Sequence, residues 1–198
     1  SAPAVHWSVM GLLDALKALN RQKVARPVDP ARFQDPFATQ VPWTPLAPGG
    51  ANFRTHALQV LGPSKLGFRK SVGYVLFGLV FLAVGGVTSS VGLVMGEWMP
   101  GLFGLPFVAV GAAVLWPRPL DFDGDTRQFT GRKGSHAFSA IRAVQLIEEI
   151  VSSSDSADYS SYELNLVLSS GERVNVVDHA GIQTLRDDAQ RIAALVGC

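Results

Sequence analysis

Three aspartates at alternate positions, Asp121, Asp123 and Asp125, have a spacing that could bind a metal, because calcium loops begin with carboxylates spaced in this way. A calcium loop of the EF-hand type that started at Asp121 would need a glycine at its sixth position and a glutamate at its twelfth. The chain has Thr126 and Arg132 there. Alternate residues of a strand also share a face, so a tight β-hairpin explains the same aspartates. We therefore predict no metal site and no cofactor.

Asp178 and His179 stand between a predicted strand and a predicted helix. A Ser–His–Asp site needs an aspartate that orients the histidine from across the ring, which adjacent residues rarely achieve. We predict instead that Asp178 caps the helix that follows. The sequence has no phosphate-binding loop and no Gly-x-Ser-x-Gly nucleophile motif. These features predict a protein that is not an enzyme.

Basic residues form a third group of candidates, for contacts with lipid headgroups. They are Lys65, Arg69, Lys70, Arg118, Arg132 and Lys133. Such residues can bind anionic headgroups. Basic residues beside a membrane segment also act simply as charges that orient the protein, and the positive-inside rule favours this simpler interpretation.

Composition excludes several other classes. The formal net charge of +1 gives no reason to expect nucleic acid as a partner. Cys198 is the single cysteine, which rules out an internal disulfide and a thiolate-rich zinc site.

A long stretch without basic residues lies in the middle of the chain. All 17 Lys and Arg residues lie outside residues 71–117, where Glu97 is the single charge. Glu97 separates two uncharged runs, and each has the roughly 20 residues that a helix needs to span a bilayer. We therefore predict that residues 71–117 form a two-helix transmembrane hairpin. Two adjacent runs of this length disfavour the alternative, a pair of buried helices in a soluble core.

The flanks of the hairpin predict its orientation. Basic residues crowd both outer ends, whereas the turn between the helices carries only Glu97. The positive-inside rule therefore places both termini in the cytoplasm, with the protein in the cytoplasmic (inner) membrane.

Small residues recur along both predicted helices. Gly92 and Gly96 lie four residues apart in the first helix, and Ala109 and Ala113 do so in the second. Small side chains at this spacing let helix backbones approach closely in lipid. They could pack the two helices against each other or against other subunits, and the sequence leaves both open. Neither span contains an ionisable residue, so we expect no proton or ion pathway.

Two segments precede the first predicted strand. Residues 1–24 contain an amphipathic helix over residues 8–23, which would lie on the membrane surface or dock on protein. The pattern of a cleaved secretion signal is lacking, so we expect this segment in the mature protein. Residues 25–51 carry six prolines, which predict an extended arm. Aromatic residues in the arm indicate that it lies against a surface.

Strand signals surround the hairpin. Two strands are expected before it and five after it, at residues 52–61, 65–70, 120–123, 126–130, 140–151, 162–168 and 173–177. The chain closes with an amphipathic helix over residues 182–196. We predict an integral membrane α+β protein in which the hairpin is inserted into one split cytoplasmic domain, residues 52–70 and 118–198.

Seven strands followed by one amphipathic helix resemble a pleckstrin-homology-like (PH-like) β-barrel or sandwich. The chain is similar in architecture to bacterial membrane proteins that join such a domain to a transmembrane helix pair. The resemblance covers residues 52–70 and 118–197, although here the hairpin lies between the second and third strands. It implies a binding or scaffolding role and no chemistry.

These features predict a non-enzymatic membrane scaffold or accessory subunit. Such a protein would assemble as a homo-oligomer or with a larger membrane complex, through its transmembrane helices and its cytoplasmic domain. The alternative is a membrane module that binds anionic lipid. The expected partners are the lipid bilayer and other membrane subunits, and not nucleic acid.

Overall fold

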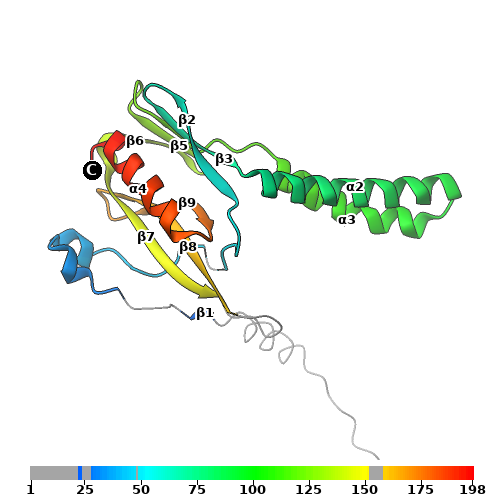
Figure 1. Cartoon of the computed structure of the whole chain (residues 1–198), viewed down its shortest axis with the longest axis horizontal. Helices are drawn as coiled ribbons and strands as arrows, with labels where there is room; N and C mark the ends of the chain where they lie inside the picture. Colours follow the sequence, from blue (N-terminus) through cyan, green and yellow to red (C-terminus); the bar gives the residue numbers. More distant parts are fainter. Residues whose placement is uncertain (1–21, 24–27, 48, 152–157) are drawn as a thin grey trace, which may run out of the picture.

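The computed structural model describes residues 22–23, 28–47, 49–151 and 158–198. Figure 1 shows an α+β domain from which a helical hairpin projects. The helix predicted at residues 8–23 lies outside the described residues except for its last two. These form a short strand, β1 (Gln22–Lys23), that pairs with the end of β7 (Ile141–Val151), so the prediction is wrong at that end. The edge of β7 offers backbone hydrogen bonds to any extended segment that reaches it.

The first sheet has five antiparallel strands in the order β2-β3-β4-β5-β6. Their bounds are His56–Gly62, Lys65–Lys70, Asp121–Asp123, Gln128–Gly131 and Gly134–Ala137. β3 and β4 are neighbours, with Leu66 opposite Phe122, although the hairpin separates them in the sequence. The chain therefore leaves this sheet for the hairpin and returns to the adjacent strand.

The second sheet has the order β1-β7-β8-β9 and is also antiparallel. β8 spans Tyr159–Leu168 and β9 spans Arg173–His179. A 3-10 turn, η3 (Phe138–Ala140), separates β6 from β7, so β7 begins a new sheet instead of extending the first. Among the described residues no strand of one sheet pairs with a strand of the other. The barrel form of the predicted domain is thus corrected to two open sheets.

One hydrophobic core joins both sheets to the C-terminal helix, α4 (Ile182–Val196). Its largest buried side chains include Phe68, Phe122, Phe129, Phe138, Leu164, Leu166, Leu185 and Ile192. Burying a side chain of this size contributes roughly 1.5–3 kcal/mol. α4 has the predicted bounds, because its apolar residues recur with the helical period and face this core.

Several strand bounds differ from the predictions. The sequence does not predict β6, because Gly-Ser-His-Ala lacks alternating apolar residues. β2 begins at His56, four residues after the predicted start, and β8 begins at Tyr159, three residues before it. The added start of β8 pairs with the end of β7, where Tyr159 lies opposite Val151. Pairing between distant segments therefore sets these bounds.

The proline-rich arm contains two 3-10 turns, η1 (Pro30–Phe33) and η2 (Pro36–Thr39), where only extended chain is predicted. Asp29 caps the first turn and Asp35 the second, each accepting the backbone N–H two residues on. A proline follows each aspartate at the start of the turn. Its fixed φ suits a helix start, so the two Asp-Pro pairs explain both turns.

The hairpin consists of α2 (Val72–Met95) and α3 (Trp98–Leu115). Ser71 Oγ caps α2 by accepting the N–H of Tyr74 at 3.1 Å. At 1.5 Å rise per residue the helices are about 36 Å and about 27 Å long, close to the ~30 Å hydrocarbon core of a bilayer. Both are therefore long and apolar enough to cross a membrane.

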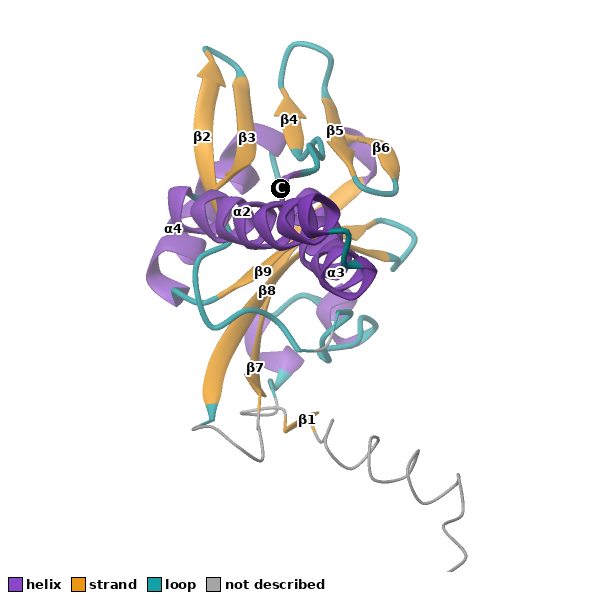
Figure 2. Cartoon of the chain, turned by 90° about the vertical axis from the view of Figure 1, so that its right-hand side faces the viewer, coloured by secondary structure: helices purple, strands orange, loops and turns teal. Residues whose placement is uncertain are grey.

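The hairpin keeps most of its apolar surface exposed. The most apolar windows of α2 and α3 are only 17% and 11% buried. Leu93 and Val94 are 81% and 88% exposed. Figure 2 views the hairpin end-on and shows the domain behind the helices rather than around them. A core helix of a soluble protein would be mostly buried, so this exposure argues against the soluble-core alternative.

Candidate functional site

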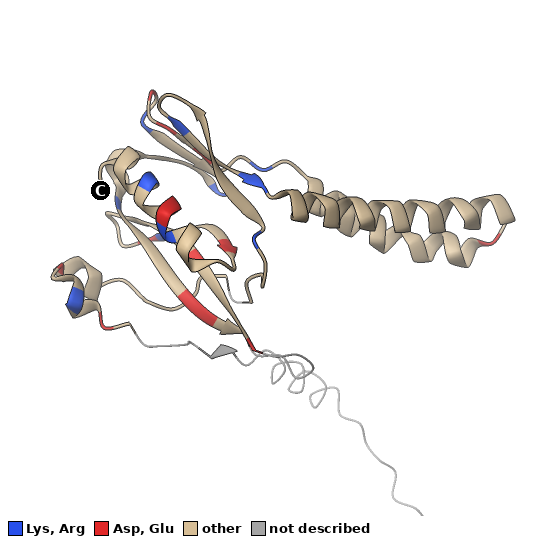
Figure 3. Ribbon diagram, in the orientation of Figure 1, with Lys and Arg blue, Asp and Glu red and all other residues tan. Residues whose placement is uncertain are grey.

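Three basic residues, named here the basic cluster, gather where the hairpin joins the domain. Lys70 ends β3, Arg118 follows α3, and Arg132 lies in the turn between β5 and β6. Lys70 and Arg118 line an open hollow of about 590 Å³, and Arg118 and Arg132 line a second hollow of about 390 Å³. Figure 3 shows Lys and Arg at the base of the hairpin and an acidic residue at its far turn. The structure thus brings four of the six predicted lipid contacts to these hollows, because Arg69 also lines the larger one.

Within the part of the chain that the structure describes, no carboxylate forms an ion pair with the basic cluster, although the charge of Arg132 acts on Asp178. Lys70 instead donates from Nζ to the carbonyl oxygen of Trp116 at 2.6 Å. Burial, and then the charges of Arg118 and Arg132, lower the pKa of Lys70. The three cations therefore lie close enough to repel one another, and an anion would relieve that repulsion.

His56, which the sequence does not identify, lies on the wall of the larger hollow. Its side chain is buried at the start of β2. Burial lowers the pKa of His56 to about 4, helped by the charges of Arg132, His179, Lys70 and Arg118. The imidazole is therefore neutral at pH 7. A single histidine within a predicted strand carries no sequence signal for this position.

The other three predicted lipid contacts do not belong to the basic cluster, although Arg69 lines the larger hollow beside Lys70. Lys65 forms an ion pair with Asp123 at 2.8 Å, and Arg69 forms one with Asp121 at 2.6 Å. Both pairs connect β3 to β4. Lys133 is exposed in the turn after β5 and lines neither hollow. The charges of Lys65 and Arg69 are thus already paired with aspartates of the same sheet.

These ion pairs also account for the aspartates that resemble a calcium loop. Asp123 Oδ1 accepts the backbone N–H groups of Asp125 and Thr126 at 2.9 and 3.1 Å. The aspartate thereby forms the turn of the β4–β5 hairpin. Among the described residues no three His, Cys, Asp or Glu side chains converge as a metal ion would require.

Asp178 does not cap α4, contrary to the prediction. β9 continues past Asp178, and Gly181, with a φ of +100°, takes the N-cap position without a side-chain hydrogen bond. Asp178 accepts a hydrogen bond from Asn175 Nδ2 at 2.9 Å. Burial raises the pKa of Asp178 to about 7. The hydrogen bond from Asn175 and the charge of Arg132 oppose this rise, and the charges of Glu163 and Glu149 assist it.

Two buried glutamates hold the arm on the second sheet. Glu163 accepts the N–H groups of Leu46 and Ala47 at 2.8 Å, and Glu149 accepts that of Gly49 at 3.0 Å. Both glutamates are 3% exposed. Hydrogen bonds to charged groups contribute roughly 1.5–3 kcal/mol each. The arm is therefore a fixed part of the domain.

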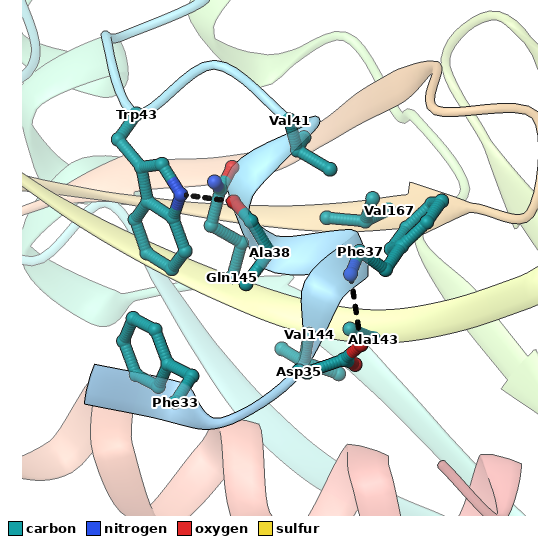
Figure 4. A pocket seen from close by; sticks show the side chains of 10 residues that line it. All are labelled: Phe33, Asp35, Phe37, Ala38, Val41, Trp43, Ala143, Val144, Gln145 and Val167. Atoms are coloured by element: carbon teal, nitrogen blue, oxygen red, sulfur yellow. Dashed lines mark hydrogen bonds between the residues drawn. The ribbon is translucent and has the colours of Figure 1, made fainter. Parts of the chain in front are cut away.

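Figure 4 shows the apolar part of the arm contact. Trp43 and Phe33 stack with ring centroids 4.9 Å apart, and Trp43 Nε1 donates to the carbonyl oxygen of Ala38 at 2.9 Å. With Phe37 and Val167 they line a cavity of about 250 Å³. The aromatic residues of the arm thus lie against the protein's own second sheet.

The two helices of the hairpin meet through glycines seven residues apart. Gly78, Gly85 and Gly92 of α2 and Gly104 and Gly111 of α3 are buried. A Cβ at Gly85 would lie 2.7 Å from the carbonyl oxygen of Gly104, and one at Gly111 would lie 2.7 Å from that of Gly78. Seven-residue spacing keeps one face of each helix toward its partner. The seven-residue spacing of these glycines is present in the sequence, but the predicted pairs of small residues, which are four positions apart, do not reveal it.

The four predicted packing residues divide between different surroundings. Gly92 packs against Gly101 of α3, whereas Gly96 ends α2 in the left-handed conformation with no neighbour close to its Cβ position. Ala109 and Ala113 are exposed on α3. Packing within the hairpin therefore uses the glycine stripe and leaves the two alanines open to other contacts.

Comparisons of the chain with protein families, with curated proteins and with solved structures found no match. The function must therefore be argued from three features of the chain. These are the exposed apolar hairpin, the domain that its own arm secures, and the basic cluster between them.

Proposed function

We propose that the chain is a membrane-anchored scaffold or accessory subunit without catalytic activity of its own. Its hairpin spans the inner membrane, and both termini and the α+β domain lie on the cytoplasmic side. It assembles with further copies or with a larger membrane complex through its helices and its domain. The PH-like identity of the domain belongs to this proposal, and two antiparallel sheets closed by a C-terminal helix support it.

The observation that carries this proposal is the apolar, exposed outer surface of a tightly packed hairpin. The two helices pack against each other through their glycines. Larger apolar side chains such as Val87, Leu93 and Phe103 remain exposed on the outer surface. Such a surface suits lipid or the helices of other membrane proteins. The basic cluster at the base and Glu97 at the far turn support the cytoplasmic side for the domain.

Cysteine cross-linking in membranes tests the assembly. With Cys198 replaced by serine, Ala109→Cys or Ala113→Cys should form cross-links between copies or to a companion subunit. Ala83→Cys, at an exposed alanine on α2 one turn from Val87, shows whether α2 takes part in the same contact. If no variant cross-links, and the protein purified in mild detergent is a monomer without a companion, the assembly proposal fails.

The basic cluster favours a second candidate function, the binding of anionic lipid. Lys70 and Arg118 directly flank the two helices, so in a membrane they would stand at the depth of the headgroups. Arg132 comes from a distant turn of the domain and lines the same surface. The positive-inside rule accounts for the basic residues that flank the helices. It does not account for a third cation, which the turn between β5 and β6 contributes.

A further inference from the structure

We infer that the hollow at the base of the hairpin binds the phosphomonoester headgroup of an anionic lipid, held by Lys70, Arg118 and Arg132. The inference rests on the second candidate function and names the ligand class for it. It goes beyond basic residues that only orient the protein in the membrane, because it assigns a binding site with defined walls.

The walls of the hollow suit a lipid with a phosphate at its end. Arg118 lines both hollows, so the surface runs continuously from Lys70 to Arg132. Leu115, the last residue of α3, and Pro117 form an apolar side of the same hollow. A phosphate beside the cations would thus leave its glycerol and acyl carbons beside the end of a membrane helix.

Charge decides between classes of phosphate. The cluster carries three positive charges, and the other two charged residues that line the larger hollow, Arg69 and Asp121, are paired with each other. A phosphodiester carries one negative charge, whereas a phosphomonoester carries about −1.5 to −2 at pH 7. The monoester also offers three terminal oxygens, and arginine binds phosphate oxygens through paired N–H groups. It therefore matches the cluster better than a diester.

His56 provides a reporter on the wall of the site. The charged or titratable groups that act on it are Arg132, His179, Lys70 and Arg118. Its Nδ1 lies 2.9 Å from Thr55 Oγ1. A bound dianion would offset the three cations, so the pKa of His56 should rise from about 4 when the site fills.

Native mass spectrometry of the full chain in mild detergent tests the inference. Phosphatidic acid, phosphatidylglycerol and phosphatidylcholine with the same acyl chains are titrated separately, and inorganic phosphate is added as a competitor. We expect phosphatidic acid to bind about tenfold more tightly than phosphatidylglycerol, and Arg118→Gln or Arg132→Gln to remove the difference. Lys133→Gln is the matched control, because it removes the next charge in the same turn but lines neither hollow.

A second readout follows the imidazole protons of His56 by NMR in the same samples. Phosphatidic acid should raise the pKa of His56, and phosphatidylglycerol should raise it less. Equal binding of both anionic lipids above phosphatidylcholine would overturn the phosphomonoester inference while leaving anionic-lipid binding in place. No preference for anionic lipid would overturn both. Full displacement by equimolar inorganic phosphate would overturn the lipid as the source of the phosphate.

Discussion

Three acids on the arm side of the second sheet, the buried Glu149 and Glu163 and the half-buried Asp178, differ in the hydrogen bonds that they accept. Glu149 and Glu163 accept backbone N–H groups from the arm. Asp178 accepts a side-chain hydrogen bond from Asn175 alone among the described residues. A carboxyl group that is largely removed from water and has few hydrogen-bond donors favours its protonated form, in agreement with a pKa of about 7 for Asp178.

Asp178→Asn should therefore stabilise the protein above pH 7. Because the folded-state pKa of Asp178 is raised to about 7, the folded protein holds a proton that the unfolded chain has released between about pH 4 and 7. Its contribution to the free energy of unfolding is present at low pH and is lost as pH rises through 7. Removing the titration should add roughly 1–3 kcal/mol at pH 8 and almost nothing at pH 4.

Thermal unfolding of both proteins in mild detergent, across this pH range, measures the effect. Asp187→Asn is the control, since Asp187 is exposed on α4. A gain for Asp178→Asn that is the same at pH 4 and pH 8 would contradict the titration as its cause.

Residue identity alone predicted only part of the site. Lys70 and Arg118 could be predicted as flanking charges, because they bound the uncharged stretch in the sequence. The pairing of Lys65 with Asp123 and Arg69 with Asp121 could not, since it depends on β3 meeting β4 across the inserted hairpin. The convergence of Arg132 on the hairpin base has the same origin in tertiary structure.

Secondary-structure elements differ in how directly their residue patterns determine them. α4 has both predicted ends because its apolar face repeats with the helical period, and the uncharged runs predicted two long apolar helices. β6 and the two turns of the arm were not predicted. Their residues lack periodicity, and their structure comes from the neighbouring strand β5 and from aspartate caps.

The glycine stripe between α2 and α3 yields a prediction about an element. Gly85→Leu should destabilise the hairpin by roughly 1–3 kcal/mol, because its Cβ meets the backbone of α3, which cannot move without separating the helices. Gly86→Leu is the matched control, since no atom lies within 4 Å of its Cβ position.

Loss of helical signal on heating in detergent, followed by circular dichroism, compares the two variants. Gly85→Leu should unfold at a lower temperature than the parent protein, and Gly86→Leu should unfold close to it. Equal behaviour of the two would show that the stripe does not hold the helices together.

At the scale of the whole molecule, the hairpin is an insertion between two neighbouring strands of one sheet. Lys70, at the end of β3, donates to the carbonyl of Trp116 after α3, so the chain leaves and re-enters the domain at adjacent points. Ser71 Oγ also donates to the carbonyl of Arg54 at 2.6 Å. The domain is thus attached to the hairpin by two connections, which holds the basic cluster at the helix ends.

The sidedness of two cysteines in membrane vesicles tests the central claim most directly. Cys198 is the chain's single cysteine and is exposed, and Glu97→Cys with Cys198→Ser places one at the far turn of the hairpin. A maleimide that cannot cross membranes should label Cys198 only in inside-out vesicles and the cysteine at 97 only in right-side-out vesicles. Labelling of both from the same side, or release of the protein by alkaline carbonate, would contradict a hairpin that spans the membrane beneath a cytoplasmic domain.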